Sequence, residues 1–184
     1  MEQDELTNSG PEFQPEVKPN SIAVRYGLYG GLASILVGLL LYVLDLTDYT
    51  KTGGGTLTAV LSYSIIIVTP IFAILAYRNI LGGLINFKQA FLCGFFTTLV
   101  MIVISSLWSY IFMSFIAPDI MDAIAQAQVT AMEDRGLSEE QIEQAQSMMG
   151  TFMKPGFMAL TALFFGSIIA AILNLILAAI LQKK

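Results

Sequence analysis

The chain has 184 residues, of which 55% are hydrophobic and only 12% charged, and its mean hydropathy is +0.71. An average soluble domain carries about 25% charged residues, so this composition excludes an ordinary water-soluble domain and indicates an integral membrane protein. The formal net charge of −5 argues against binding nucleic acid, and the absence of histidine removes the commonest general base and metal ligand.

Residues 1–20 form an acidic tail ahead of the first apolar segment. Five acidic residues accompany one lysine in this tail, and Pro11, Pro15 and Pro19 recur at four-residue intervals. We expect a disordered or extended cytoplasmic tether, with a docking peptide for a cytoplasmic partner as the alternative. A cleaved signal peptide starts short and basic, so the sequence predicts that none is present.

Four apolar segments follow, at about 22–44, 57–76, 90–116 and 157–181. Each is near or above the roughly 20 residues that cross a ~30 Å hydrocarbon core as a helix. A membrane barrel would show short alternating segments instead. The sequence therefore predicts an all-α fold in which residues 21–184 form an integral membrane four-helix bundle.

Small residues recur at four-residue intervals in the first and fourth apolar segments. Such stripes let helix backbones approach closely in a membrane, and an asparagine among them can add an interhelical hydrogen bond of about 1 kcal/mol. We expect helix packing within the bundle at these positions, with the interface of a homo-oligomer as the alternative. The positions are Gly27, Gly31, Ser34, Gly38, Gly166, Ala170 and Asn174.

The connection between the second and third segments contains two glycines that break the helix and two cations. We expect it to lie on the inner leaflet, with Ile85 and Phe87 at an interfacial depth and each cation meeting anionic headgroups for roughly 1 kcal/mol. A docking site for a cytoplasmic or membrane partner is the alternative. The residues of this prediction are Arg78, Gly82, Gly83, Phe87 and Lys88.

The cations also predict the orientation of the chain. Four spans place both termini on one side, and that side collects six cations, whereas the other side has Lys51, Arg135 and Lys154. Cytoplasmic loops carry an excess of Lys and Arg, so both the N- and the C-terminus are predicted to be cytoplasmic.

The third connection, about 118–153, is too long for a simple turn between packed helices. Apolar residues recur at helical spacing in both halves, Gly136 suits the end of a helix, and Ser138 with Gln141 forms a capping-box pattern. The sequence therefore predicts an extracytoplasmic helical hairpin between the third and fourth spans. We expect its apolar faces to pack together or to lie on the bilayer interface.

Asp119 and Asp122 are the only candidate pair for carboxylate chemistry. At i and i+3 they share one helix face, where they suit a divalent cation with water ligands. A solvated helix start explains them better, because acids favour the first turn and no third ligand is evident. The single cysteine, Cys93, has no cysteine partner and no nucleotide or hydrolase motif occurs, so the sequence predicts a non-enzymatic protein without a metal or cofactor.

The order of several motifs resembles a known family. "GGLINFKQAFLCG" follows the second apolar segment, "SFIAPDIMD" ends the third, and "EDRGLSEEQIEQ" precedes the fourth. This order is similar to the domain-of-unknown-function family 4199 over nearly everything after residue 20. The resemblance implies a four-span protein of the bacterial inner membrane and brings no activity with it.

Three functional classes fit these observations. The leading hypothesis is a non-catalytic accessory protein that is surrounded by membrane lipids and contacts a membrane or envelope protein through its basic loop and its hairpin. The second is a small transport or lipid-handling protein, which needs either an oligomer or a groove lined by serine and threonine of the third span. The third is a membrane enzyme that uses Asp119 and Asp122.

Overall fold

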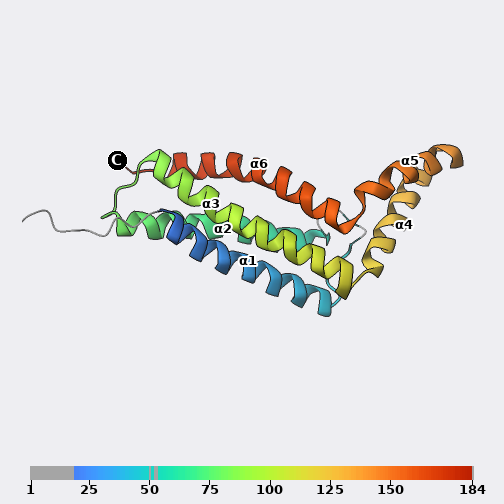
Figure 1. Ribbon diagram of the computed structural model, residues 1–184, viewed down its shortest axis with the longest axis horizontal. Helices are drawn as coiled ribbons and strands as arrows, with labels where there is room; N and C mark the ends of the chain where they lie inside the picture. The colour runs from blue at the N-terminus through green and yellow to red at the C-terminus, as the bar shows by residue number, and fades with distance from the viewer. Residues whose placement is uncertain (1–18, 50, 52–53, 184) are drawn as a thin grey trace, which may run out of the picture.

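The computed structural model describes residues 19–49, 51 and 54–183, and nearly all of them are helical (Figure 1). Four long helices lie side by side, and two shorter helices form an arm that leaves one end of the bundle at an angle (Figure 1). Most of the predicted tail, residues 1–18, lies outside the described residues. The elements in chain order are α1 (Pro19–Val43), α2 (Thr56–Ile80), α3 (Phe87–Ile111), the π-helical turn η2 (Phe112–Ile116), α4 (Asp119–Asp134), α5 (Glu139–Phe152) and α6 (Pro155–Leu181).

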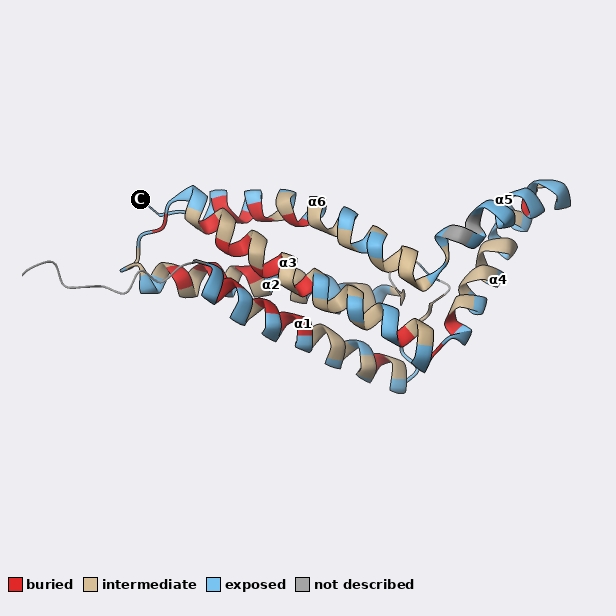
Figure 2. Cartoon of the chain, in the orientation of Figure 1, coloured by how far each residue is buried: buried red, intermediate tan, exposed pale blue. Residues whose placement is uncertain are grey.

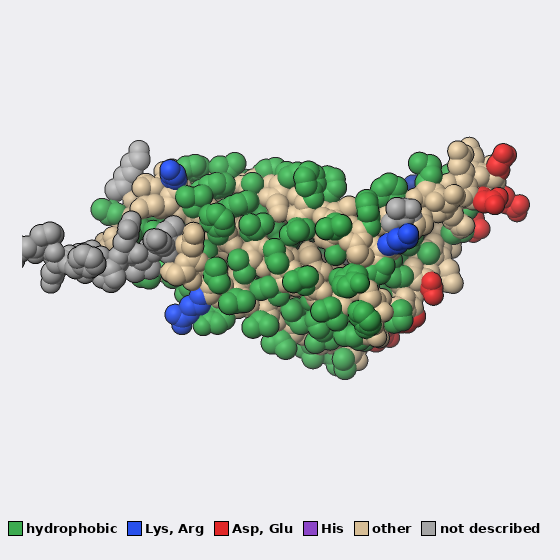
Figure 3. All heavy atoms as spheres, in the orientation of Figure 1, with side chains coloured by type: hydrophobic (Ala, Val, Ile, Leu, Met, Phe, Trp, Pro, Cys, Tyr) green, Lys and Arg blue, Asp and Glu red, His purple; other side chains and the backbone are tan. Residues whose placement is uncertain are grey.

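Four of these helical segments are long and apolar enough to cross a membrane, which confirms the prediction of an all-α protein with four spans. The third reaches 30 residues because η2 continues α3. Large apolar side chains such as Leu36 and Ile180 cover the outside of the bundle, as expected for a surface in contact with lipid (Figure 3). The segments are Asn20–Val43, Thr56–Ile80, Phe87–Ile116 and Pro155–Leu181.

The central helix of the bundle is α3, which packs against α1, α2 and α6. It begins at Phe87, three residues before the predicted start, because Asn86 caps it. The Asn86 side chain accepts a hydrogen bond from the Gln89 backbone N–H (2.9 Å), and the Gln89 side chain accepts one from the Asn86 N–H (3.2 Å). This reciprocal pair satisfies two backbone donors that the start of a helix otherwise leaves unpaired.

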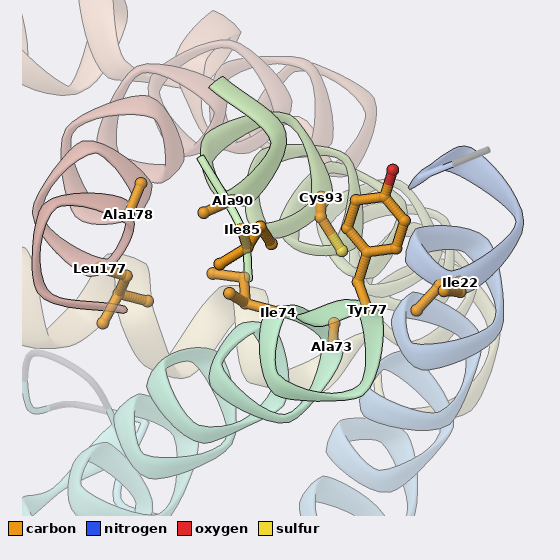
Figure 4. Packing of buried hydrophobic residues seen from close by; sticks show 9 residues of the cluster. All are labelled: Ile22, Ala73, Ile74, Tyr77, Ile85, Ala90, Cys93, Leu177 and Ala178. Carbon is orange, nitrogen blue, oxygen red and sulfur yellow. The ribbon is translucent and has the colours of Figure 1, made fainter. Parts of the chain in front are cut away.

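Buried residues gather on the inward faces of the bundle, mainly in the half that contains the C-terminus (Figure 2). There, side chains from all four spans and from the α2–α3 loop converge on one apolar cluster (Figure 4). A smaller cluster at the other end joins Phe112, Ala117 and Ile120, where η2 meets the arm. The larger cluster consists of Ile22, Ala73, Ile74, Tyr77, Ile85, Ala90, Cys93, Leu177 and Ala178.

The α2–α3 loop is fastened to the C-terminus of the chain. Gly82 and Gly83 have positive φ angles of 76° and 93°, which turn the chain back toward the bundle. Ile85 then exchanges two backbone hydrogen bonds with Lys183, both of 2.9 Å, and its side chain is only 1% exposed. The Ile85 side chain therefore completes the core between α2, α3 and α6, and its interfacial depth in the membrane stays a prediction.

The arm consists of the two helices predicted between the third and fourth spans. Gly136 between them has a φ of 77°, and the Ser138–Gln141 capping box is present, with hydrogen bonds of 3.0 and 3.4 Å. The apolar faces of α4 and α5 do not close on each other along their length, because an open groove of about 670 Å³ separates them. The extracytoplasmic position of the arm remains a prediction.

Candidate functional site

A buried polar pair joins α3 to α6 near the middle of the bundle. Asn174 is fully buried, and its Nδ2 donates hydrogen bonds to Thr98 Oγ1 (2.9 Å) and to the Ala170 carbonyl oxygen (2.8 Å). Thr98 in turn donates to the Gly94 carbonyl oxygen (3.1 Å). A polar bond between spans is directional, so this pair fixes the register of α6 against α3.

The other oxygen of this amide, Asn174 Oδ1, is buried without a hydrogen-bond partner among the described residues. It lies against Gly94, where an added Cβ would overlap it and would also come within 2.9 Å of Ile74 Cδ1. The absence of a side chain at Gly94 therefore creates the space in which Asn174 lies. Ala170, one helical turn before Asn174, is 2% exposed and belongs to the same buried seam.

The glycines of α1 differ in what they contact. A Cβ at Gly27 would lie 2.8 Å from the Thr97 carbonyl oxygen, and one at Gly31 would lie 3.0 Å from Ile104, so both positions hold α1 close to α3. At Gly38 a Cβ would meet nothing within 4 Å. Gly38 therefore makes no close packing contact with another described helix of this chain, although Leu39 and Tyr42 beside it do pack against the cluster of Phe112, Ala117 and Ile120.

The space around Gly166 of α6 is intermediate between the tight contacts at Gly27 and the open space at Gly38. A Cβ at this position would meet Ile102 at 3.4 Å, which is an ordinary contact, so α6 does not need glycine there to approach α3. The predicted close approach thus occurs at the α1 glycines and at Gly94, which the sequence reasoning did not single out. The sequence does contain a signal for Gly94, because it is a small residue one helical turn before the polar Thr98.

A groove of about 400 Å³ lies inside the membrane-spanning part of the bundle, beyond the Asn174–Thr98 pair on the side of the arm. Its wall combines apolar residues with hydroxyl groups from three helices, and Gly38 forms part of it. The residues that line it are Ser34, Ile35, Gly38, Ser62, Ile66, Thr98, Met101, Ile102, Ser105, Ser106, Trp108, Ser109 and Ala162.

The arm carries the second groove and most of the negative charge of the described chain. Ala125, Val129 and Glu133 of α4 face Gly150 of α5, and Met153 just after α5, across this groove. Acidic side chains gather toward the tip of the arm, whereas the body of the bundle is apolar (Figure 3). The wall of this groove therefore combines apolar residues with the polar side chains of Gln126, Thr130, Glu133 and Gln146, and further acidic residues lie toward the tip of the arm.

Asp119 and Asp122 lie exposed in the first turn of α4. Within the described residues, no group of three or more Asp, Glu, His or Cys side chains is arranged to hold a metal ion. The structure thus places these carboxylates at a solvated helix start, where they oppose the positive end of the helix dipole.

At the opposite end, no carboxylate of the described residues forms an ion pair with a basic residue of the α2–α3 loop. Arg78 is half-buried in the last turn of α2, and Lys88 is exposed in the first turn of α3. Phe87 is 39% exposed and stacks on Phe91 with a ring separation of 6.4 Å. This arrangement suits contact with the headgroup region, where aromatic rings and long cations both gain stabilisation.

The α1–α2 loop contains an exposed ion pair between Lys51 Nζ and Asp48 Oδ2 at 2.7 Å. The hydrogen bond to Asp48 raises the pKa of Lys51 above its usual value. Burial raises the pKa of Tyr49 in the same loop, so neither group titrates near neutral pH.

Comparison with protein families decides the classification. The model of the family described as "Protein of unknown function (DUF4199)" matches residues 25–183. The chain belongs to the DUF4199 family. The DUF4199 match covers most of the first span, the other three spans, the α2–α3 loop and the whole arm, so both grooves lie within it. No curated protein and no solved structure matches the chain.

Proposed function

We propose that this protein is a non-catalytic accessory protein of the bacterial inner membrane that binds a partner protein through the α4–α5 arm. The observation that carries this proposal is the open groove between the two helices of the arm. A groove of this kind between two amphipathic helices accepts a third amphipathic helix on its apolar floor. The arm leaves the bundle, so a partner can reach this groove without displacing a span (Figure 1).

Charge indicates the chemistry of the partner. Seven acidic residues and one arginine lie between Asp119 and Met153, and Glu133 is part of the groove wall. Anionic headgroups repel such a surface, so a protein segment with basic side chains fits the arm better than a membrane surface does. Charge complementarity of this kind speeds association and excludes wrong partners.

The proposal includes the orientation and the absence of catalysis. The excess of cations on the side of the termini supports a cytoplasmic location for both ends and a position of the arm across the membrane. A chain without histidine, with one cysteine and with Asp119 and Asp122 at an exposed helix start offers little for acid–base or nucleophilic chemistry. Binding therefore accounts for the exposed features better than a reaction does.

The proposal predicts a partner that is lost when the groove is altered. The tagged protein is extracted from its native membrane into nanodiscs, and the accompanying proteins are measured by quantitative mass spectrometry. We expect one protein in stoichiometric amount. Recovery of this protein is expected to fall at least about tenfold with Glu133→Lys, because placing a like charge against a basic partner weakens binding by more than about 1.4 kcal/mol, which corresponds to a tenfold change in affinity. Val129→Asp is expected to have a similar effect through the apolar floor.

Asp122→Lys is the matched control, since Asp122 is exposed on the same helix but does not line the groove. Recovery with this variant is expected to equal that of the unaltered protein. The proposal fails if no protein is recovered in stoichiometric amount, or if Glu133→Lys and Asp122→Lys reduce recovery equally.

A further inference from the structure

The groove inside the bundle is open to the surrounding bilayer. Its edges include Ser62 of α2 and Ala162 of α6, and both residues are exposed. Contacts between α2 and α6 are sparse, and the core cluster that joins them lies at the other end of the bundle around Ile74 and Leu177. Whatever fills this groove therefore enters from the lipid phase between α2 and α6.

Three hydroxyl groups of the groove differ from its other hydroxyls in having no hydrogen-bond partner among the described residues. A serine or threonine in a membrane helix normally donates to the carbonyl one turn earlier, as Ser34 does to Gly30 (2.9 Å) and Thr98 to Gly94 (3.1 Å). Ser62, Ser105 and Ser106 form no hydrogen bond to any described residue, and all three line the groove. A hydroxyl in a hydrocarbon environment gains from a polar partner, so these three favour a ligand that carries one.

The polar group of such a ligand must be uncharged. The described residues that line the groove include no Lys, Arg, Asp or Glu. An ionised group would lie there without a counter-charge in a medium of low dielectric constant, which is strongly unfavourable. An ester, a ketone or a hydroxyl can instead exchange hydrogen bonds with serine at no such cost.

The depth of the hydroxyls argues against the ester groups of ordinary phospholipids. Ser105 and Ser106 lie about four residues from the middle of the third span, Phe87–Ile116, which corresponds to about 6 Å at 1.5 Å per residue. Half of the hydrocarbon core is about 15 Å thick, so these side chains lie roughly 9 Å below the headgroups. A charged headgroup would have to be drawn inward to place its esters there.

We infer that this groove binds a neutral lipid, with one hydrocarbon chain against Met101, Ile102 and Trp108 and an uncharged oxygen group at Ser62, Ser105 and Ser106. This binding site is separate from the arm and does not depend on the partner proposed above. The protein thus selects a lipid by a small uncharged oxygen group that can enter the hydrocarbon.

Trp108 is the only tryptophan of the chain and lines the groove, so its fluorescence reports occupancy directly. The full-length protein is placed in phosphatidylcholine nanodiscs and titrated with dibrominated monoacylglycerol, whose bromine atoms quench on contact. Dibrominated lysophosphatidylcholine, with the same single chain and a charged headgroup, is the matched probe. We expect saturable quenching by the monoacylglycerol only.

The variant Ser62→Ala/Ser105→Ala/Ser106→Ala is expected to raise the half-saturating monoacylglycerol concentration about two- to tenfold. Ser64→Ala is the control, because Ser64 donates to its own helix at Val60 (2.7 Å) and does not line the groove. Ala162→Leu, which narrows the groove, is expected to abolish saturation, and circular dichroism verifies that each variant is folded.

Three results would overturn the inference. Equal, unsaturable quenching by both probes would mean that bulk lipid chains fill the groove without selection. Quenching by neither probe, together with a dimer in the nanodisc, would mean that a second copy covers it. A half-saturating monoacylglycerol concentration that is the same in the triple serine variant would show that the three hydroxyl groups do not bind the ligand, which contradicts the proposed site.

Discussion

Gly27→Ala is expected to lower the free energy of unfolding by about 1–3 kcal/mol, although alanine favours a helix more than glycine does. The new methyl group would lie 2.8 Å from the Thr97 carbonyl oxygen and 2.7 Å from Val100 Cβ. The Thr97 backbone in α3 cannot move aside as the end of a flexible side chain can, so α1 must move away from α3 to make room for the methyl group. Unfolding by sodium dodecyl sulfate, followed by circular dichroism, measures the change.

Gly38→Ala is the matched control in the same helix. A Cβ there meets nothing within 4 Å, so the substitution is expected to leave the stability unchanged or to raise it by up to about 1 kcal/mol through helix propensity. Equal losses at Gly27 and Gly38 would show that α1 does not pack against α3 as described.

Gly94→Ala is expected to cost at least as much, because its methyl group would overlap Asn174 Oδ1 and crowd Ile74. Asn174 cannot retreat without giving up its hydrogen bonds to Thr98 and Ala170. We expect a loss of about 2–3 kcal/mol in the same unfolding measurement.

A double-mutant cycle separates the overlap from a general effect of alanine. Asn174→Ala alone loses the interhelical hydrogen bond and leaves a cavity, for a cost of about 1–2 kcal/mol. In the Asn174→Ala background, Gly94→Ala is expected to cost at least about 1 kcal/mol less than in the unaltered chain, because the overlapping amide is gone. Additive losses would contradict the contact between Gly94 and Asn174.

The positions of the spans could be predicted because hydropathy and length report directly on the bilayer. The arm could also be predicted, since Gly136, Ser138 and Gln141 are local signals that need no tertiary contact. The start of α3 was missed by three residues, although Asn86 and Gln89 already form the pattern of a cap in the sequence.

The contacts of the α1 stripe show where periodicity stops being informative. Gly27, Gly31, Ser34 and Gly38 lie within about 60° of one another on a helix of 3.6 residues per turn, so the sequence assigns all four to one face. Gly27 and Gly31 on that face lie against α3, whereas Gly38 borders the groove, and α1 meets the end of the third span again where Tyr42 contacts Phe112. The place of this gap depends on how two helices pack, which no single-helix pattern contains.

Long-range partners were beyond the sequence for the same reason. Asn174 was expected to form an interhelical bond, but Thr98 as its partner depends on the register of α6 along α3. The burial of Ile85 depends on its backbone pairing with Lys183 at the far end of the chain, which no local pattern contains. Contacts of this kind follow from the assembled bundle.

The proposed function requires the arm and the termini to lie on opposite sides of the membrane. The direct measurement is labelling of Ser138→Cys in the arm and of Asn86→Cys in the α2–α3 loop, each in a Cys93→Ala background, with a membrane-impermeant maleimide on spheroplasts. The account predicts that Ser138→Cys is labelled on intact spheroplasts and that Asn86→Cys is labelled only after permeabilisation. The reverse pattern, or labelling of both from outside, would contradict it.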